Sequence, residues 1–81
     1  MKDVERDHLR KTILELLSKG YTHYVRIEKR AIASCSPFIT SNTFRAQFYG
    51  YLLAQGFIIR VGRGQYALTE KGKNYLALLS Q

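Results

Sequence analysis

The side chains best suited to chemistry in this sequence lie close together, within residues 41–49. They carry amide, guanidinium and phenol groups, at spacings that place them on one side of a helix and its flanks: Asn42, Arg45, Gln47 and Tyr49. Arginine pairs with guanine in the major groove of DNA, and asparagine or glutamine pairs with adenine. The chemistry that this stretch indicates is hydrogen bonding to base edges and phosphates.

The same stretch begins with groups suited to a phosphate. Ser41 and Thr43 carry hydroxyls beside the free backbone amides of a helix start. Ala46 follows on the same polar face of the helix. A polar helix face turned to solvent is the competing interpretation. It is disfavoured because the stretch holds no Asp or Glu, whereas solvated helices usually mix charges of both signs.

Four further cations have the same two interpretations, phosphate contact or solvation. Arg63 stands between two glycines at the tip of an expected hairpin, where it would reach a minor groove or a phosphate. Arg60 lies on the preceding strand and is equally suited to pairing across the hairpin. Lys29 and Arg30 open an expected helix, beside the path of a DNA backbone.

The charge distribution favours a polyanionic partner. The 81 residues include 13 Lys and Arg against 6 Asp and Glu, which gives a net charge of +7. No carboxylate occurs between Glu28 and Glu70, so charge of one sign runs through the middle of the chain. A field of this kind attracts nucleic acid.

Other chemistries find no matching residues. Cys35 has no second cysteine and no histidine at a metal-binding spacing, so we expect a small buried residue there. His8 and His23 are expected to be surface groups, and we expect no metal or cofactor. The sequence shows no carboxylate pair, no nucleophile beside a base and no phosphate-binding loop, which argues against an enzyme.

Length and composition predict one soluble domain over residues 1–81. No apolar run approaches the roughly 20 residues of a membrane span. We expect no signal peptide, because the N-terminal residues are charged throughout. We therefore expect a cytoplasmic protein.

The first half of the chain predicts a helix, a strand and a helix. Apolar residues recur at helical spacing over residues 3–19, with Asp3 as the N-cap. Aromatic and β-branched residues predict a short strand over residues 21–27. A second helix over residues 28–34 would have three residues on its inner side: Ala31, Ile32 and Cys35.

A third helix is expected from residues 40–42, which are all good N-caps, to Gln55. Its apolar face would hold Phe44, Phe48, Tyr51, Leu52 and Gln55. Gly50 inside this helix costs about 0.5–1 kcal/mol relative to alanine, which close packing or a ligand would explain.

The end of the chain predicts a hairpin and a last helix. Residues 57–61 and 65–68 form the strands, and a tight glycine turn joins them. Thr69 caps a helix that runs to about Leu79. The elements together define an α+β protein.

The most specific motifs are LLAQGFI at residues 52–58 and VGRGQYALTEKG at residues 61–72. With the order of elements over residues 3–79, they resemble the winged helix-turn-helix family. They are similar to the ends of small bacterial and archaeal transcription regulators, including archaeal ones carried by viruses or plasmids. Two departures from the family are a short second helix and a very short wing.

The resemblance implies a winged helix-turn-helix fold and binding of double-stranded DNA. The third helix would enter the major groove, and the wing would lie alongside it. The implied contact residues are those already singled out: Ser41, Asn42, Thr43, Arg45, Ala46, Gln47, Tyr49, Arg60, Arg63, Lys29 and Arg30.

The terminal helices carry more apolar residues than one small domain can cover. Residues 75–79 are apolar nearly all round, and Val4 and Leu9 of the first helix are suited to join them. We expect a homodimer through these helices. Its two-fold axis would place two third helices about one DNA turn apart on a palindromic site.

Two other functions remain as alternatives. A winged-helix module that binds a protein in a transcription or replication complex would show an apolar or mixed surface on its third helix and wing. A platform that stacks single-stranded bases would need several tyrosines on one exposed sheet face: Tyr21, Tyr24, Tyr66 and Tyr75.

Overall fold

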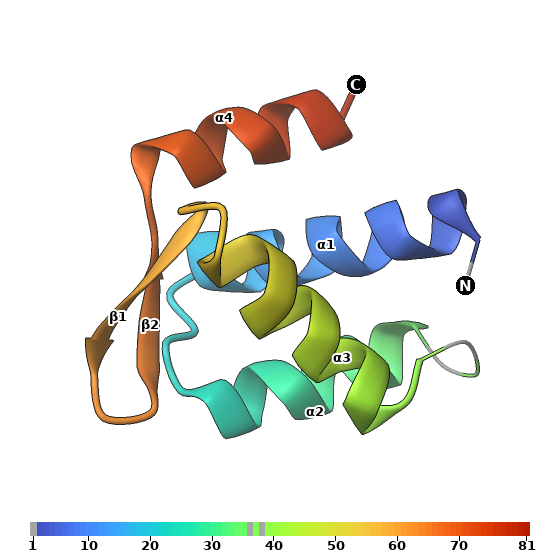
Figure 1. Cartoon of the computed structure of the whole chain (residues 1–81), viewed down its shortest axis with the longest axis horizontal. Coiled ribbons are helices and arrows are strands. Elements are labelled where there is room, and N and C mark those ends of the chain that lie inside the picture. The colour runs from blue at the N-terminus through green and yellow to red at the C-terminus, as the bar shows by residue number, and fades with distance from the viewer. Residues whose placement is uncertain (1, 36, 38) are drawn as a thin grey trace.

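The computed structural model describes residues 2–35, 37 and 39–81 (Figure 1). Its elements are, in order, α1 (Asp3–Ser18), α2 (Tyr24–Cys35), α3 (Ser41–Gln47), a π-helical segment η1 (Phe48–Leu53), β1 (Ile58–Gly62), β2 (Gln65–Leu68) and α4 (Glu70–Leu79). The described residues thus form an α+β fold with four α-helices and one antiparallel hairpin. Within them, no helix combines the length and apolar character that a membrane crossing requires.

The other helices pack around α1. Both α2 and α4 contact α1, and the continuous helix of α3 and η1 crosses in front of it in the view of Figure 1. α4 runs antiparallel to α1, so the start of α1 and the end of α4 lie at the same end of the molecule. The hairpin lies at the other end, where β2 contacts α1 and β1 contacts η1.

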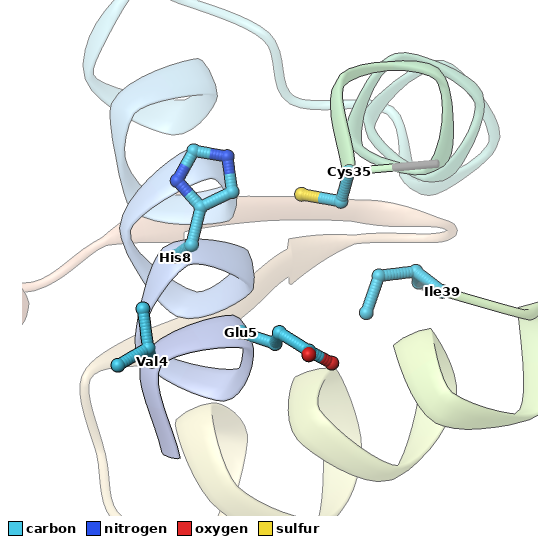
Figure 2. Close-up of a pocket in the computed structure, with 5 residues that line it drawn as sticks. All are labelled: Val4, Glu5, His8, Cys35 and Ile39. Atoms are coloured by element: carbon cyan, nitrogen blue, oxygen red, sulfur yellow. The ribbon is translucent and has the colours of Figure 1, made fainter. Parts of the chain in front are cut away.

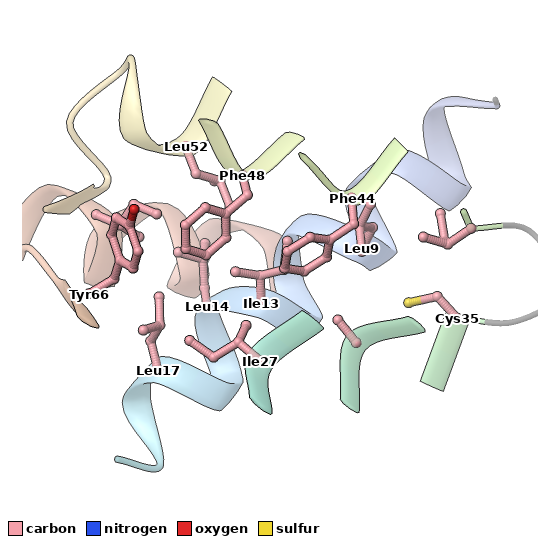
Figure 3. Packing of buried hydrophobic residues seen from close by; sticks show 13 residues of the cluster. Leu9, Ile13, Leu14, Leu17, Ile27, Cys35, Phe44, Phe48, Leu52 and Tyr66 are labelled. Atoms are coloured by element: carbon pink, nitrogen blue, oxygen red, sulfur yellow. The ribbon is translucent and has the colours of Figure 1, made fainter. Parts of the chain in front are cut away.

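The core lies between α1, α2 and the α3–η1 helix (Figure 3). Its largest fully buried side chains are apolar and come from five elements: Leu9, Ile13, Leu14, Ile27, Phe44, Phe48, Leu52 and Ile58. Cys35 is buried with them, as expected. Leu9 was expected to join a dimer surface, and that is wrong, because its side chain is wholly inside this core.

The strand expected over residues 21–27 is also wrong. α2 already begins at Tyr24, and strand pairing is reduced to one bridge between His23 and Gln65. Ile27 and Cys35 are both buried and lie two helical turns apart, with buried Ala31 midway between them. A helix buries all three positions on one face, whereas a strand would have buried alternate residues.

The N-caps expected for the third and the last helix are confirmed, and among residues 40–42 the cap is Thr40. The Thr40 hydroxyl accepts a hydrogen bond from the amide of Thr43 at 3.2 Å, and Thr69 caps α4 in the same way. The expected cap of α1 is wrong. Lys2 occupies the cap position without a side-chain bond, and Asp3 is the first helical residue, where its charge favours the helix N-terminus.

The helix expected to run to Gln55 changes type on the way. It is α-helical to Gln47 and π-helical from Phe48 to Leu53. A π-helix has a longer hydrogen-bond repeat than an α-helix, so residues after Gln47 are shifted around the axis relative to those before it. Gln55 was expected on the buried face and is exposed.

The hairpin has an apolar inner side and a mixed outer side. Ile58 pairs with Leu68 and Arg60 with Tyr66, and a bulge separates Arg60 from Gly62. Gly62 pairs with Gln65, so the tip is the dipeptide Arg63-Gly64, which is one residue shorter than expected. Gly64 has a φ of 68°, a conformation that short hairpin loops require and that glycine adopts without strain.

The start of α4 is packed against the segment that precedes β1. The Thr69 hydroxyl accepts from the amide of Gly72 at 3.0 Å and lies 2.7 Å from the carbonyl oxygen of Gly56, to which it donates. Gly72 is buried, and a Cβ atom there would collide with the carbonyl oxygen of Phe57. The Thr-x-x-Gly spacing is therefore explained by packing: Thr69 caps α4, and Gly72 lets α4 approach the backbone that precedes β1.

Candidate nucleic-acid interface

One side of the α3–η1 helix is exposed from Asn42 to Gly50. The exposed residues recur about one turn apart and form a surface that we call the α3 face: Asn42, Arg45, Ala46, Tyr49 and Gly50. Ser41 is exposed beside it, in the first turn. The structure thus brings together the sequence-predicted residues Ser41, Asn42, Arg45, Ala46 and Tyr49.

Tyr49 is held in place by an aromatic cluster. Its ring stacks on that of Tyr24 in α2, with centroids 5.4 Å apart and planes 25° apart. Tyr24 in turn meets the edges of Phe44 and Phe48, at centroid distances of 5.5 and 5.1 Å. The cluster continues to Tyr66 of β2, 4.8 Å from Phe48. It therefore fixes an exposed phenol of the α3 face against α2 and the hairpin.

The two stacked phenols remain protonated hydrogen-bond donors at neutral pH. Burial raises the pKa of Tyr24 and of Tyr49. The Glu28 carboxylate raises the pKa of Tyr24 further, the Tyr66 hydroxyl raises that of Tyr49, and the nearby Arg45 guanidinium lowers each in part. The Tyr24 hydroxyl is already used, because it donates to the Glu28 carboxylate at 3.3 Å. Arg45 and Tyr49 thus lie close together as a cation and a neutral donor on one exposed face.

Two of the sequence-predicted residues are engaged within the protein. The hydroxyl of Thr43 lies 3.1 Å from that of Thr40, and the Thr43 amide is bound by the same cap. The amide oxygen of Gln47 accepts a hydrogen bond from Nε of Arg10 at 2.7 Å. Both residues are only half exposed. Neither belongs to the α3 face.

The cations of the hairpin are exposed. Arg60 lies opposite Tyr66 and donates through Nε to the carbonyl of Gly62 at 3.2 Å, so it braces its own strand rather than pairing across the hairpin. Arg63 lies at the tip. The tip is tied to α2, because the Tyr24 amide donates to the carbonyl of Gly64 at 2.9 Å. Arg63 is therefore held beside the first turn of α2.

The exposed side of α2 is also basic. Lys29 and Arg30 are exposed as expected, and the Arg30 guanidinium lies 4.8 Å from the centre of the Tyr21 ring. Arg26 is also exposed, one turn earlier in α2. The sequence pattern did not single out Arg26, because it fell inside the expected strand.

No ion pair neutralises this surface within the described residues. The ion pairs found among the described residues join Arg6 to Asp3 and Asp7, and Lys73 to Glu70. All of them lie outside the carboxylate-free stretch between Glu28 and Glu70. The cations of the α3 face, the hairpin and α2 keep their charges available to a partner.

The four tyrosines considered for base stacking do not share an exposed sheet face. Tyr66 is 6% exposed and faces the core. Tyr75 lies elsewhere, with its ring stacked on Phe57 at 4.3 Å. A single-strand stacking platform is therefore not formed by these residues.

A small pocket of about 200 Å³ lies between the start of α1 and the end of α2 (Figure 2). Val4, Glu5 and His8 line one side, and Cys35 and Ile39 line the other. Burial raises the pKa of the Cys35 thiol, whose sulfur lies 3.8 Å from the Thr12 hydroxyl. No set of three or more metal-ligating side chains occurs among the described residues, here or elsewhere.

Comparisons with protein-family models, with curated proteins and with solved structures found no match to this chain. We therefore infer the function from the α3 face and from the exposed cations of the hairpin and α2.

Proposed function

We propose that this chain is a winged helix-turn-helix protein that binds double-stranded DNA and acts as a transcription regulator. The α3–η1 helix enters the major groove, and the β1–β2 hairpin lies on the minor groove or the backbone as a short wing. The observation that carries the proposal is the α3 face. It exposes Asn42, Arg45 and Tyr49 together, in a stretch of chain without a carboxylate.

The residues divide between base contacts and phosphate contacts. Arg45 suits a bidentate contact to guanine and Asn42 one to adenine, while the Tyr49 phenol suits a single hydrogen bond. Arg63 at the hairpin tip and the exposed cations of α2 suit phosphates, which position a protein without reading sequence. Selection of bound duplexes from a random pool tests the proposal, and recovery of no enriched sequence would refute specific reading.

We predict a steep salt dependence of binding. If each protomer neutralises about four or five phosphates, a dimer touches about eight to ten, and the slope of log K against log salt is roughly −7 to −9. Fluorescence anisotropy with a labelled duplex over a salt series measures this slope. A slope shallower than about −2 would contradict DNA as the main partner.

Gly50 offers a test in which stability and binding change in opposite directions. A Cβ atom there would meet none of the described residues within 4 Å, so the free protein gives no packing reason for glycine. Gly50→Ala should therefore raise the free energy of unfolding by about 0.5–1 kcal/mol. If the α3 face contacts DNA, the added methyl group blocks close approach of the DNA, so the affinity for DNA should fall. Denaturant titration and anisotropy measure the two effects, and unchanged affinity would remove Gly50 from the contact surface.

The proposal includes a homodimer through the terminal helices. Leu78 is 64% exposed and Val4 is 80% exposed, on helices whose free ends lie at one end of the molecule (Figure 1). We predict that Leu78→Glu converts a dimer to a monomer, because a carboxylate in an apolar interface loses its hydration. Sedimentation velocity measures this. A wild-type protein that is monomeric at high micromolar concentration would contradict the dimer.

A protein-binding winged-helix module is the second candidate. Ile59 and Val61 are 49% and 53% exposed on the outer side of the hairpin, which favours an apolar contact there. The two candidates differ in the salt series, because apolar contacts are far less sensitive to salt than phosphate contacts.

A further inference from the structure

Arg10 is a charged side chain inside the protein. It lies in α1 and is 8% exposed, whereas charged side chains are rarely buried unless they are paired. Among the described residues, no carboxylate forms an ion pair with it. The contacts that replace a counter-ion therefore require an explanation.

Three neutral side chains from three elements surround the guanidinium. Nε donates to the amide oxygen of Gln47 at 2.7 Å, and Nη1 donates to the hydroxyl of Tyr75 at 3.2 Å. The guanidinium carbon lies 3.4 Å from the centre of the Tyr51 ring, a close cation–π contact. We call Arg10, Gln47, Tyr51 and Tyr75 the Arg10 clamp.

The clamp lies where the helix changes type. Gln47 is the last residue of α3, and Tyr51 lies within η1. Arg10 therefore binds one residue on each side of the α-to-π junction, and Tyr75 connects the same guanidinium to α4. Arg45 and Tyr49 of the α3 face also lie on opposite sides of this junction, so their relative direction depends on it.

We propose that Arg10 is a positioning residue for the α3 face. By holding the α-to-π junction, it sets the angle around the helix between Arg45 and Tyr49. The inference rests on the proposed DNA-binding function and changes the role of Gln47, which becomes a clamp residue rather than a reader of bases. A planar guanidinium is needed, because an ammonium group cannot stack on Tyr51 while it donates in two fixed directions.

The first experiment distinguishes the clamp role of Gln47 from a base contact. Gln47→Glu keeps an acceptor for Arg10, so affinity for a selected duplex should stay within about threefold, because charge-assisted bonds are stronger than neutral ones. Ala46→Glu makes the same change of charge one residue earlier, on the α3 face. It should lower affinity by about tenfold or more, through repulsion of phosphates. Equal losses in the two variants would overturn the proposal.

The second experiment uses the free protein and does not depend on DNA. Arg10→Lys should accelerate amide hydrogen exchange in η1 by about tenfold or more, while amides of α2 change little, because local opening is confined to the loosened unit. Arg6→Lys is the matched control, since among the described residues Arg6 pairs only with acids of its own helix, Asp3 and Asp7. Tyr75→Phe and Gln47→Ala each remove one hydrogen bond to Arg10. They replace Arg10→Lys in the exchange experiment if that variant does not fold.

The two possible failures can be told apart. Unchanged exchange in η1 for all the clamp variants overturns the positioning role, even if the protein binds DNA. If the wild type enriches no duplex, the proposed function fails, and the exchange data still decide whether Arg10 holds the junction. Support requires faster exchange in η1 together with a lower ratio of specific to random affinity in Arg10→Lys or Gln47→Ala.

Discussion

Replacing Arg45 by alanine should lower the affinity for a selected DNA site by roughly 10- to 100-fold, in line with the value of a bidentate base contact. Random DNA should lose less, so the specificity ratio falls. The reason is the location of Arg45. It is exposed on the α3 face, beside a phenol held in place by Tyr24, and no carboxylate neutralises it among the described residues.

Arg63→Ala is the matched comparison, because it removes the same group from the hairpin tip. A phosphate contact carries no sequence information, so specific and random affinities should fall about equally and the salt slope should flatten by about one unit. Competition binding with a selected and a scrambled duplex gives the four affinities, and circular dichroism checks the fold. An unchanged specificity ratio in Arg45→Ala would remove Arg45 from base reading. Full affinity in both variants would favour the protein-binding module.

Gly72→Ala should lower the free energy of unfolding by at least about 2 kcal/mol, at the level of a severely overpacked core site. A Cβ atom at this position would collide with the carbonyl oxygen of Phe57 and come within 2.8 Å of Leu68. Relief requires a movement of α4 away from the hairpin joint, which would also strain the Thr69 cap. Urea denaturation followed by circular dichroism measures the loss.

Gly50→Ala is the control for this substitution, because it makes the same change within a helix at a position where the Cβ atom meets no described residue within 4 Å. The two variants should shift stability in opposite directions. A Gly72→Ala protein as stable as the wild type would mean that α4 is free to move at this joint. The tight packing of Gly72 would then not explain the Thr-x-x-Gly spacing.

Local sequence patterns determined most of the elements. The hairpin followed from its glycine turn between apolar runs, and α4 followed from Thr69 as its cap. Phe44, Phe48 and Leu52 were predicted to lie on one buried face and do so. These predictions succeeded because caps, turns and periodicity act over a few residues and are visible in the chain itself. The exposure of Asn42, Arg45 and Tyr49 followed from the same periodicity.

Only the tertiary structure decided the features that depend on distant residues. The segment from 24 to 27 has β-forming residues, yet it is helical because Ile27 fills the core from α2. Gln47 has the chemistry of a base reader, but its partner Arg10 lies 37 residues away in the chain. Arg10 itself resembles its charged neighbours in α1, and it is buried where Gln47, Tyr51 and Tyr75 pack around it. A local pattern records what a side chain can do, and the packing of distant elements decides which partner it meets.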